Sequence, residues 1–579
     1  MAQTIENTLG SNPAAPVPAP ASERRQWFVL FLLGVLCLLP GILGRDPWKA
    51  DEAYSFGMVL EMFQRGDWVV PTLAGEPFME KPPIMYITAT LCAKVLGGVL
   101  PLHDAARLAA LLFNAISLAA LGLASREMWG ARQWWLGPVL FLGAVGPMHT
   151  QHMLMTDVAL LTGFALGHAG LALCLRQPRW GGLLLGTGIG VAFLAKGLLG
   201  PGLMGLTALL LPIFKPWRTS GYLKTLMIAA VACLPWVVIW PTLLFLRSPF
   251  LFREWLIVNN FGRFAGTTGL GPKNVPFFYF RLLPWFALPV LPLALWTMVK
   301  ERREVARNSG LQLTAVSFLV MLAVLSLAGD GRSLYAQPML VPLALAAIPA
   351  VDGMEGRLGR GLAGFVAGLA ILTGLGAWLA FGLIQAGIPA QLHQWLQTQV
   401  PQYVPGVEWL PFLGGILVVG AALICWKGPG GGLGRTVVFR WTVTTGMIYG
   451  LGMTLFLPIV NTNMTYRITF SELARHLPEV RGSVASYGLG EPQRGLLHYY
   501  AGLRTLRVEL KPEVLGTADL VLVQGNYRDN VLMGPPAQGP WNLRWEGRRG
   551  GRESFRLYQR IPSAAPQPGT PALPSLKTS

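Results

Sequence analysis

Apolar runs of roughly 20 residues recur between positions 27 and 460, separated by short polar segments. Clear examples cover positions 27–43, 153–175, 222–246 and 362–384. A helix of about 20 apolar residues is long enough to cross the hydrocarbon core of a bilayer. The pattern therefore predicts an all-α polytopic membrane protein.

The distribution of basic residues predicts how these helices are oriented. Arg24 and Arg25 precede the first apolar run, and many later Lys and Arg residues lie in short loops, whereas positions 385–408 contain neither. Cytoplasmic loops carry an excess of Lys and Arg. This bias holds along most of the chain if positions 83–100 lie along the membrane interface instead of spanning it. We therefore expect about thirteen spans, a cytoplasmic N-terminus, and a first periplasmic loop at 45–103 that contains juxtamembrane helices.

Changes in composition predict the domain boundaries. Positions 1–22 and 562–579 are rich in Ala and Pro without periodicity, so we expect two disordered tails. Positions 23–460 form the predicted transmembrane domain, and 461–561 are more polar. This polar segment has β-like runs at 484–487, 506–510, 518–523 and 555–558, and a helical stretch around 496–500. It predicts a small α/β domain on the periplasmic side.

Composition agrees with a membrane protein and excludes other classes. Hydrophobic residues make up 53% of the chain and charged residues 13%, whereas a soluble domain carries about 25% charged residues. The net charge of +18 does not indicate nucleic-acid binding, because the basic residues lie between apolar runs. The five cysteines all lie in apolar runs without a CxxC pair, which is typical of small buried side chains.

The first long loop holds a dense group of ionisable residues. Asp51 and Glu52 follow the first apolar run, and Glu80 and Lys81 precede two prolines. Ionisable groups beside a bilayer are costly and therefore often functional. Asp51 fits either a helix N-cap or a catalytic carboxylate. Lys81 and Glu80 fit either a charged cap before a Pro-initiated helix or a pair that binds a phosphate and a divalent metal ion.

Further polar residues interrupt the later apolar runs. Asp157 lies one turn into a run, where we expect a partner such as Arg107 or Lys196. His149 and His152 are three residues apart, a spacing that fits either hydrogen-bonded side chains or a metal site.

Arg263, in an outer loop, suits phosphate recognition, although a surface arginine is the plainer alternative. In the predicted topology the polar candidates share one face of the membrane. They are Asp51, Glu80, Lys81, Asp157, Lys196, Arg263, Arg332 and Tyr335. We expect a single extracytoplasmic site that handles charge.

Several short motifs resemble those of GT-C membrane glycosyltransferases, in the group that contains protein O-mannosyltransferases and lipid A aminoarabinose transferases. The matching stretches are Ala50-Asp51-Glu52-Ala53-Tyr54, Gly66-Asp67-Trp68-Val69-Val70-Pro71, Glu80-Lys81-Pro82-Pro83, Thr156-Asp157, Ala195-Lys196-Gly197, Arg263-Phe264 and Leu334-Tyr335. The resemblance covers positions 27 to about 350, and the layout is most similar to the aminoarabinose transferases.

The resemblance implies roles for individual residues. It implies Asp51 as the key catalytic carboxylate, and contacts to the donor phosphate from Lys81, Arg263 and Tyr335. We also expect Asp157 to act in catalysis and Lys196 to contact the donor phosphate. Glu80 would bind a divalent metal ion (Zn, Mg or Mn), together with Asn260 or His149. The aminoarabinose transferases carry a histidine near Asn260, and an arginine where this chain has Tyr54 or Ser55.

We therefore expect an inverting glycosyltransferase of the bacterial inner membrane. Its donor would be a sugar carried on polyprenyl (undecaprenyl) phosphate, possibly 4-amino-4-deoxy-L-arabinose. Its acceptor would be lipid A or another envelope molecule on the periplasmic face, and the protein would act as a monomer among membrane lipids. One alternative is transfer of another sugar to a protein or glycan. A flippase for the same lipid is less favoured, because the chain shows no internal repeat.

Overall fold

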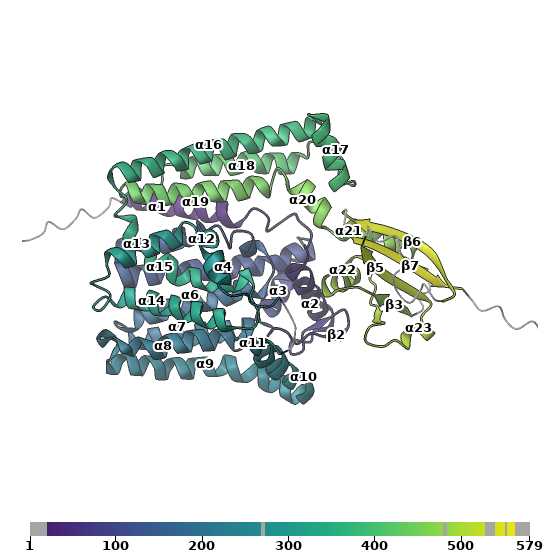
Figure 1. Ribbon diagram of the computed structural model, residues 1–579, viewed down its shortest axis with the longest axis horizontal. Helices are drawn as coiled ribbons and strands as arrows, with labels where there is room; N and C mark the ends of the chain where they lie inside the picture. The colour runs from purple at the N-terminus through teal and green to yellow at the C-terminus, as the bar shows by residue number, and fades with distance from the viewer. Residues whose placement is uncertain (1–19, 268–271, 479–482, 527–538, 551–552, 562–579) are drawn as a thin grey trace, which may run out of the picture.

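The structure is a helical bundle with a small sheet-containing domain at one end (Figure 1). The computed structural model describes residues 20–267, 272–478, 483–526, 539–550 and 553–561. Most of the two predicted tails, 1–19 and 562–579, lies outside the described residues. Helix α2 and the following loop lie between the bundle and the C-terminal domain, where they pack against α22 (Figure 1).

The helices follow the apolar runs of the sequence. The first part of the chain forms α1 (Pro20–Leu38), α2 (Asp51–Arg65), α3 (Ile84–Leu96), α4 (Leu102–Trp129), α5 (Leu136–Leu142), α6 (Thr156–Cys174), α7 (Pro178–Lys196), α8 (Leu199–Leu210), α9 (Ser220–Arg247), α10 (Pro249–Arg253) and α11 (Arg263–Ala265). The second part forms α12 (Phe278–Phe286), α13 (Val290–Lys300), α14 (Ser309–Leu327), α15 (Leu340–Val351), α16 (Gly356–Ala386), α17 (Ala390–Gln399), α18 (Trp409–Cys425), α19 (Leu433–Gly452) and α20 (Leu457–Met464).

Six helical segments among the described residues are long and apolar enough to cross a membrane, or up to eight if each of two bent pairs is one span. The bent pairs are α12 with α13, at 102°, and α19 with α20, at 61°. The expected count of about thirteen is therefore not confirmed. Several apolar runs form short helices: α3 has 13 residues and a length of about 20 Å, which is less than the roughly 30 Å of a hydrocarbon core.

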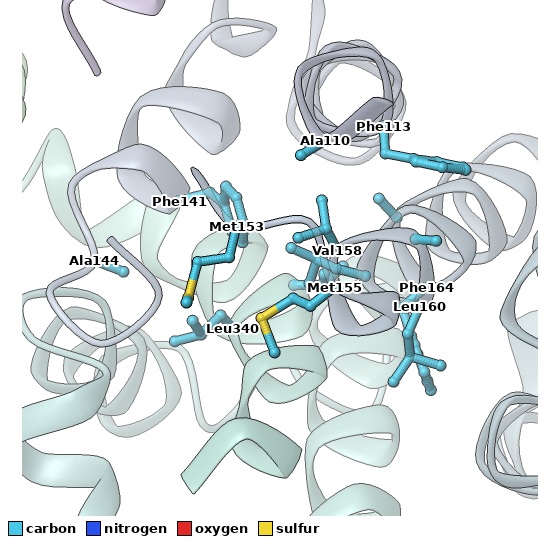
Figure 2. Close-up of a cluster of buried hydrophobic side chains, with 14 of the residues drawn as sticks. Ala110, Phe113, Phe141, Ala144, Met153, Met155, Val158, Leu160, Phe164 and Leu340 are labelled. Atoms are coloured by element: carbon cyan, nitrogen blue, oxygen red, sulfur yellow. The ribbon is translucent and has the colours of Figure 1, made fainter. Parts of the chain in front are cut away.

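The bundle has a continuous apolar core. Figure 2 shows part of it, with labelled side chains from α4, α5, α6 and α15 and from the segment before α6. These labelled residues are Ala110, Phe113, Phe141, Ala144, Met153, Met155, Val158, Leu160, Phe164 and Leu340. Small residues bring α6 and α7 close together, since a Cβ on Gly163 would lie 2.6 Å from the backbone of Ala192. This close packing fixes the ends of α6 and α7 relative to each other.

The C-terminal domain is α/β, as the alternating pattern predicts. Its elements are α21 (Arg467–His476), β3 (Val484–Tyr487), α22 (Glu491–Ala501), β4 (Leu506–Arg507), α23 (Val514–Thr517), β5 (Leu520–Asn526), β6 (Trp541–Arg549) and β7 (Glu553–Arg560). The strands form one mixed sheet in the order β4-β3-β5-β7-β6. Strand β3 pairs in parallel with β4 and β5, and β7 pairs antiparallel with β5 and β6. Strand β6 was not predicted from the sequence.

Ion pairs join the C-terminal domain to the first loop, which includes a two-strand ladder of β1 (Thr72–Leu73) and β2 (Glu76–Pro77). The pairs are Glu61 with Arg504 at 3.1 Å, Glu76 with Arg494 at 2.9 Å, and Lys49 with Glu553 at 2.6 Å. The Glu61 side chain is only 1% exposed, so removing its partners would leave a buried charge unpaired. These ion pairs therefore fix the position of the first loop relative to the C-terminal domain.

Two glycines allow α2 and α22 to cross at very short range. A Cβ on Gly57 would lie 3.0 Å from the Cα of Gly495 and 2.5 Å from a methyl carbon of Leu73. The leucine side chain has room to move, whereas the α22 backbone does not move without displacing the domain. Gly57 is therefore required by the crossing and not by the helix itself.

We expect Gly57→Val to loosen the C-terminal domain and to destabilise the protein by about 1–3 kcal/mol, the usual cost of overpacking. Gly364→Val is the matched control, because Gly364 also lies inside a helix but has open space where a Cβ would be. Thermal unfolding and limited proteolysis after α20 measure the effect. Equal melting temperatures for the two variants would contradict the requirement for a glycine at this crossing.

Candidate active site

A cavity of about 420 Å³ lies where several helices of the bundle begin or end. It brings together nearly all of the predicted site residues. Its lining includes Asp51, Glu80, Lys81, Asp157, Lys196, Asn260, Arg263 and Tyr335. These side chains come from segments as far apart in sequence as α2 and the turn before α15. His149 is not part of this lining; it stacks on Trp48 instead, with ring centroids 6.1 Å apart.

Asp51, Tyr54 and Lys81 form a hydrogen-bonded group at the start of α2. The Tyr54 hydroxyl donates to the Asp51 carboxylate. The Lys81 ammonium donates to the Tyr54 oxygen and lies 3.4 Å from Oδ1 of Asp51. The N-cap position of α2 is Ala50, without a side-chain cap, so Asp51 is directed to Tyr54 and Lys81 and not to the helix backbone.

The environment of Asp51 favours its charged form. Burial raises the pKa of this carboxyl, but the charge of Lys81 and the hydrogen bond from Tyr54 lower it more, so the net shift is downward. Asp51 is therefore a carboxylate at neutral pH that accepts hydrogen bonds while its side chain remains 23% exposed.

Asp157 and Lys196 form a second pair across the cavity. The Lys196 ammonium, at the last residue of α7, donates to Oδ1 of Asp157 in the first turn of α6. The same ammonium lies 4.4 Å from the ring centroid of Tyr335, a cation–π contact. Of the two partners expected for Asp157, Lys196 is the one that contacts it in the structure.

Arg107, the other expected partner of Asp157, belongs to a buried network beside the cavity. Its guanidinium donates to Glu52 at 2.8 Å and to Asp104 at 2.7 Å. Glu52 also pairs with Arg45. Burial raises the pKa of Glu52, but the charges of Arg107 and Arg45 lower it to about 2. This network holds Glu52, the residue next to Asp51, in place. It was not predicted from the sequence, since its charged residues lie in three separate segments.

Arg263 lies between two carboxylates. Its guanidinium is 3.2 Å from Glu80 and 3.1 Å from Asp330. Burial lowers the pKa of Arg263, but the charge of Glu80, the nearby Tyr335 and the hydrogen bond to Asp330 together raise it more, so the guanidinium remains charged. Asp330 was not a predicted site residue. It lies in Gly329-Asp330-Gly331-Arg332, a polar break between apolar runs that was a usable signal in the sequence.

The described residues do not fit the predicted metal site. Glu80 is paired with Arg263, and Asn260 is used within the protein: its Oδ1 accepts from the backbone of Leu198, and its Nδ2 donates to the backbone of Trp255. Within the described ranges, no group of three or more His, Cys, Asp or Glu side chains is arranged to hold a metal ion.

The rest of the cavity wall is apolar. It is formed by α8, α14 and the segment just before α11. The apolar lining residues include Leu199, Leu203, Leu206, Phe261, Val324 and Leu325. One cavity thus combines a group of paired charges with a hydrocarbon-like wall. That combination suits a ligand with an anionic head and a long apolar chain.

Comparison with known proteins gives two kinds of relative. No protein-family model matches the chain. Among curated proteins, an undecaprenyl phosphate-α-4-amino-4-deoxy-L-arabinose arabinosyl transferase of Pseudomonas aeruginosa is 28% identical over 340 residues, 56% of this chain and 59% of the relative. The enzyme of the same name from Serratia proteamaculans is 25% identical over 412 residues, 68% of this chain and 71% of the relative. The chain thus spans about three fifths of the length of the Pseudomonas protein.

Solved structures show the fold. The crystal structure of ArnT from Cupriavidus metallidurans bound to undecaprenyl phosphate has a TM-score of 0.65 and 18% identity, and covers 94% of this chain and 99% of ArnT. The apo structure gives a TM-score of 0.66 at 17% identity. The chain has the fold of the GT-C membrane glycosyltransferases, as the sequence motifs predict. Within that class, the fold is that of ArnT.

Proposed function

We propose that this protein is an inverting glycosyltransferase that takes a sugar from a polyprenyl phosphate donor. The observation that carries the proposal is the main cavity, in which paired charges meet an apolar wall. Lys81, Arg263, Lys196 and Tyr335 surround the expected position of the donor phosphate, and the leucines of α8 line the expected path of the prenyl chain. The curated relatives act on undecaprenyl phosphate-linked aminoarabinose, which is therefore the proposed donor.

The proposed reaction needs stabilisation of the departing phosphate. An acceptor oxygen forms a bond to the anomeric carbon of the sugar, and the bond from that carbon to the phosphate oxygen breaks. Polyprenyl phosphate leaves with the electron pair, and the Lys81 and Arg263 cations stabilise its new charge. Attack from the face opposite the phosphate inverts the configuration of the anomeric carbon.

Asp51 acts on the acceptor side. For a hydroxyl acceptor, the carboxylate of Asp51 takes the proton as the new bond forms. For an acceptor that is already an anionic phosphate, no proton is transferred, and Asp51 stabilises the positive charge that develops on the sugar ring. Asp157 is proposed to hold Lys196 against Tyr335. The proposed acceptor is lipid A or another envelope glycolipid, with a protein or another glycan as the alternative.

The proposed location follows from the donor. We place the protein in the bacterial inner membrane, with its N-terminus in the cytoplasm and its first loop and C-terminal domain in the periplasm. This placement keeps the short basic loops on the cytoplasmic side. We also propose that the protein acts as a monomer.

An assay with radiolabelled undecaprenyl phosphate-aminoarabinose and purified protein in nanodiscs tests the proposal. We expect lipid A to become labelled, with release of undecaprenyl phosphate only when acceptor is present. Intact donor that crosses the bilayer of a proteoliposome without cleavage would show a flippase instead. Labelling of a different acceptor would support the proposed transferase activity but would show that lipid A is not the acceptor.

A further inference from the structure

A second cavity lies on the other side of Asp51, between the first loop and the C-terminal domain. It has a volume of about 420 Å³, within the roughly 300–1,000 Å³ typical of small-molecule sites. Three of its lining residues, Asp51, Glu80 and Arg332, also line the main cavity. The two cavities therefore meet at Asp51, Glu80 and Arg332.

The second cavity contains buried polar atoms that lack partners. The Oε1 atoms of Gln493 and Gln524 and the Nε of Arg332 are buried and accept or donate no hydrogen bond among the described residues. Gln493 is only 2% exposed, and its Nε2 donates to Glu553 at 3.3 Å. An unpaired buried polar atom costs roughly 1–3 kcal/mol. Three such atoms around one cavity indicate a ligand that both donates and accepts hydrogen bonds.

The charges of the cavity narrow the class of ligand. Asp51, Glu80 and Glu491 line it as carboxyl groups. Asp51 is paired with Lys81, Glu80 with Arg263, and Lys49 with Glu553. Glu491 and Arg332 are the charged lining residues that remain, and their opposite charges balance, which favours a neutral polar group over a phosphate-rich one. Burial and the charge of Glu80 also raise the pKa of Glu491, so Glu491 has a greater tendency than an ordinary glutamate to donate a hydrogen bond.

We infer that this second cavity is a sugar-binding site built by the C-terminal domain, with Glu491, Gln493, Gln524 and Arg332 as its hydrogen-bonding groups. A sugar ring presents hydroxyls that donate and accept, which matches the unpaired amide oxygens and the guanidinium. The inference rests on the proposed transferase function, because only that function places a sugar at the junction of the cavities. The ring belongs either to the donor or to the acceptor.

The test uses Glu491→Gln and Gln524→Leu in the full chain in nanodiscs. Their matched controls are Glu513→Gln and Gln559→Leu, which change the same residue types in the same domain outside the cavity. Three quantities are measured for each: the Kd for undecaprenyl phosphate, the KM for undecaprenyl phosphate-aminoarabinose, and the KM for lipid A.

For both cavity variants we expect about a tenfold rise in one of the two KM values, the change that follows from losing one hydrogen bond in a buried site. The Kd for undecaprenyl phosphate, which carries no sugar, should stay unchanged. A higher donor KM identifies the transferred sugar as the occupant, and a higher lipid A KM identifies the acceptor.

Two results would overturn the sugar site. One is unaltered KM values for both substrates, within twofold of the controls. The other is an equal loss of affinity for undecaprenyl phosphate and both substrates, which would show a structural defect. Failure of the wild-type protein to bind undecaprenyl phosphate or to transfer sugar would refute the proposed function itself, a result that is visible before any variant is compared.

Discussion

Asp51→Asn is expected to lower the rate of transfer by about 10²–10⁴-fold, the range associated with loss of a general base. The substitution keeps the size of the side chain and an oxygen that accepts from the Tyr54 hydroxyl. It removes the negative charge at the junction of the two cavities. The affinity for undecaprenyl phosphate should change much less than the turnover number, because Asp51 acts on the acceptor side.

Asp352→Asn is the control for this substitution, since Asp352 pairs with Arg435 and does not line the main cavity. The pH profile adds a second readout. A carboxyl whose pKa is lowered keeps its charge as the pH falls, so the Asp51 carboxylate should remain ionised, and the wild-type rate should not fall through its protonation between pH 7 and pH 5. An Asp51→Asn enzyme with more than a tenth of wild-type activity would rule out this role.

Lys81→Ala is expected to lower kcat/KM by about 10²–10³-fold, the usual effect of removing one group that stabilises a developing anion. Lys81 is 8% exposed and lies beside both Asp51 and the expected donor phosphate. Its loss removes a cation from the site and leaves Asp51 without its nearest positive charge. The Kd for undecaprenyl phosphate, measured by titration, should rise as well.

The control is Lys94→Ala, because Lys94 lies over the ring of Trp68 at 5.0 Å and does not line the main cavity. Lys81→Arg should recover part of the lost activity, since it keeps the charge but changes the shape of the donor group. Unchanged binding of undecaprenyl phosphate by Lys81→Ala would show that the phosphate lies elsewhere.

The sequence was most informative where polarity interrupts apolar runs. Asp157 and Lys196 are separated by 39 positions, yet each stands out because a lone charge in an apolar run is costly. Asp330 also interrupts an apolar run, but its two glycine neighbours give it the local pattern of an ordinary turn. The roles of these residues in catalysis are still predictions.

The groups that the sequence could not place are those defined by docking between distant segments. Gln493 and Gln524 are ordinary polar residues of a small α/β domain, and nothing in their local pattern marks them. They become candidate site residues only in the folded protein, where α22 crosses α2 and a cavity forms against the first loop. The span count is not confirmed for a related reason, since apolar length alone does not distinguish a spanning helix from a short helix packed in the bundle.

The first loop is held by the last strand. Lys49 bonds to Glu553 across 504 positions, and the carboxylate of Asp46 accepts from the hydroxyl of Tyr500 at 3.2 Å. During synthesis, the ribosome makes the segment around Asp51 first and the residues that hold it last. A chain that stops before β7 keeps every residue that lines the two cavities. It loses Glu553, the partner of Lys49, so the segment next to Asp51 loses a contact even though the whole helical bundle has been made.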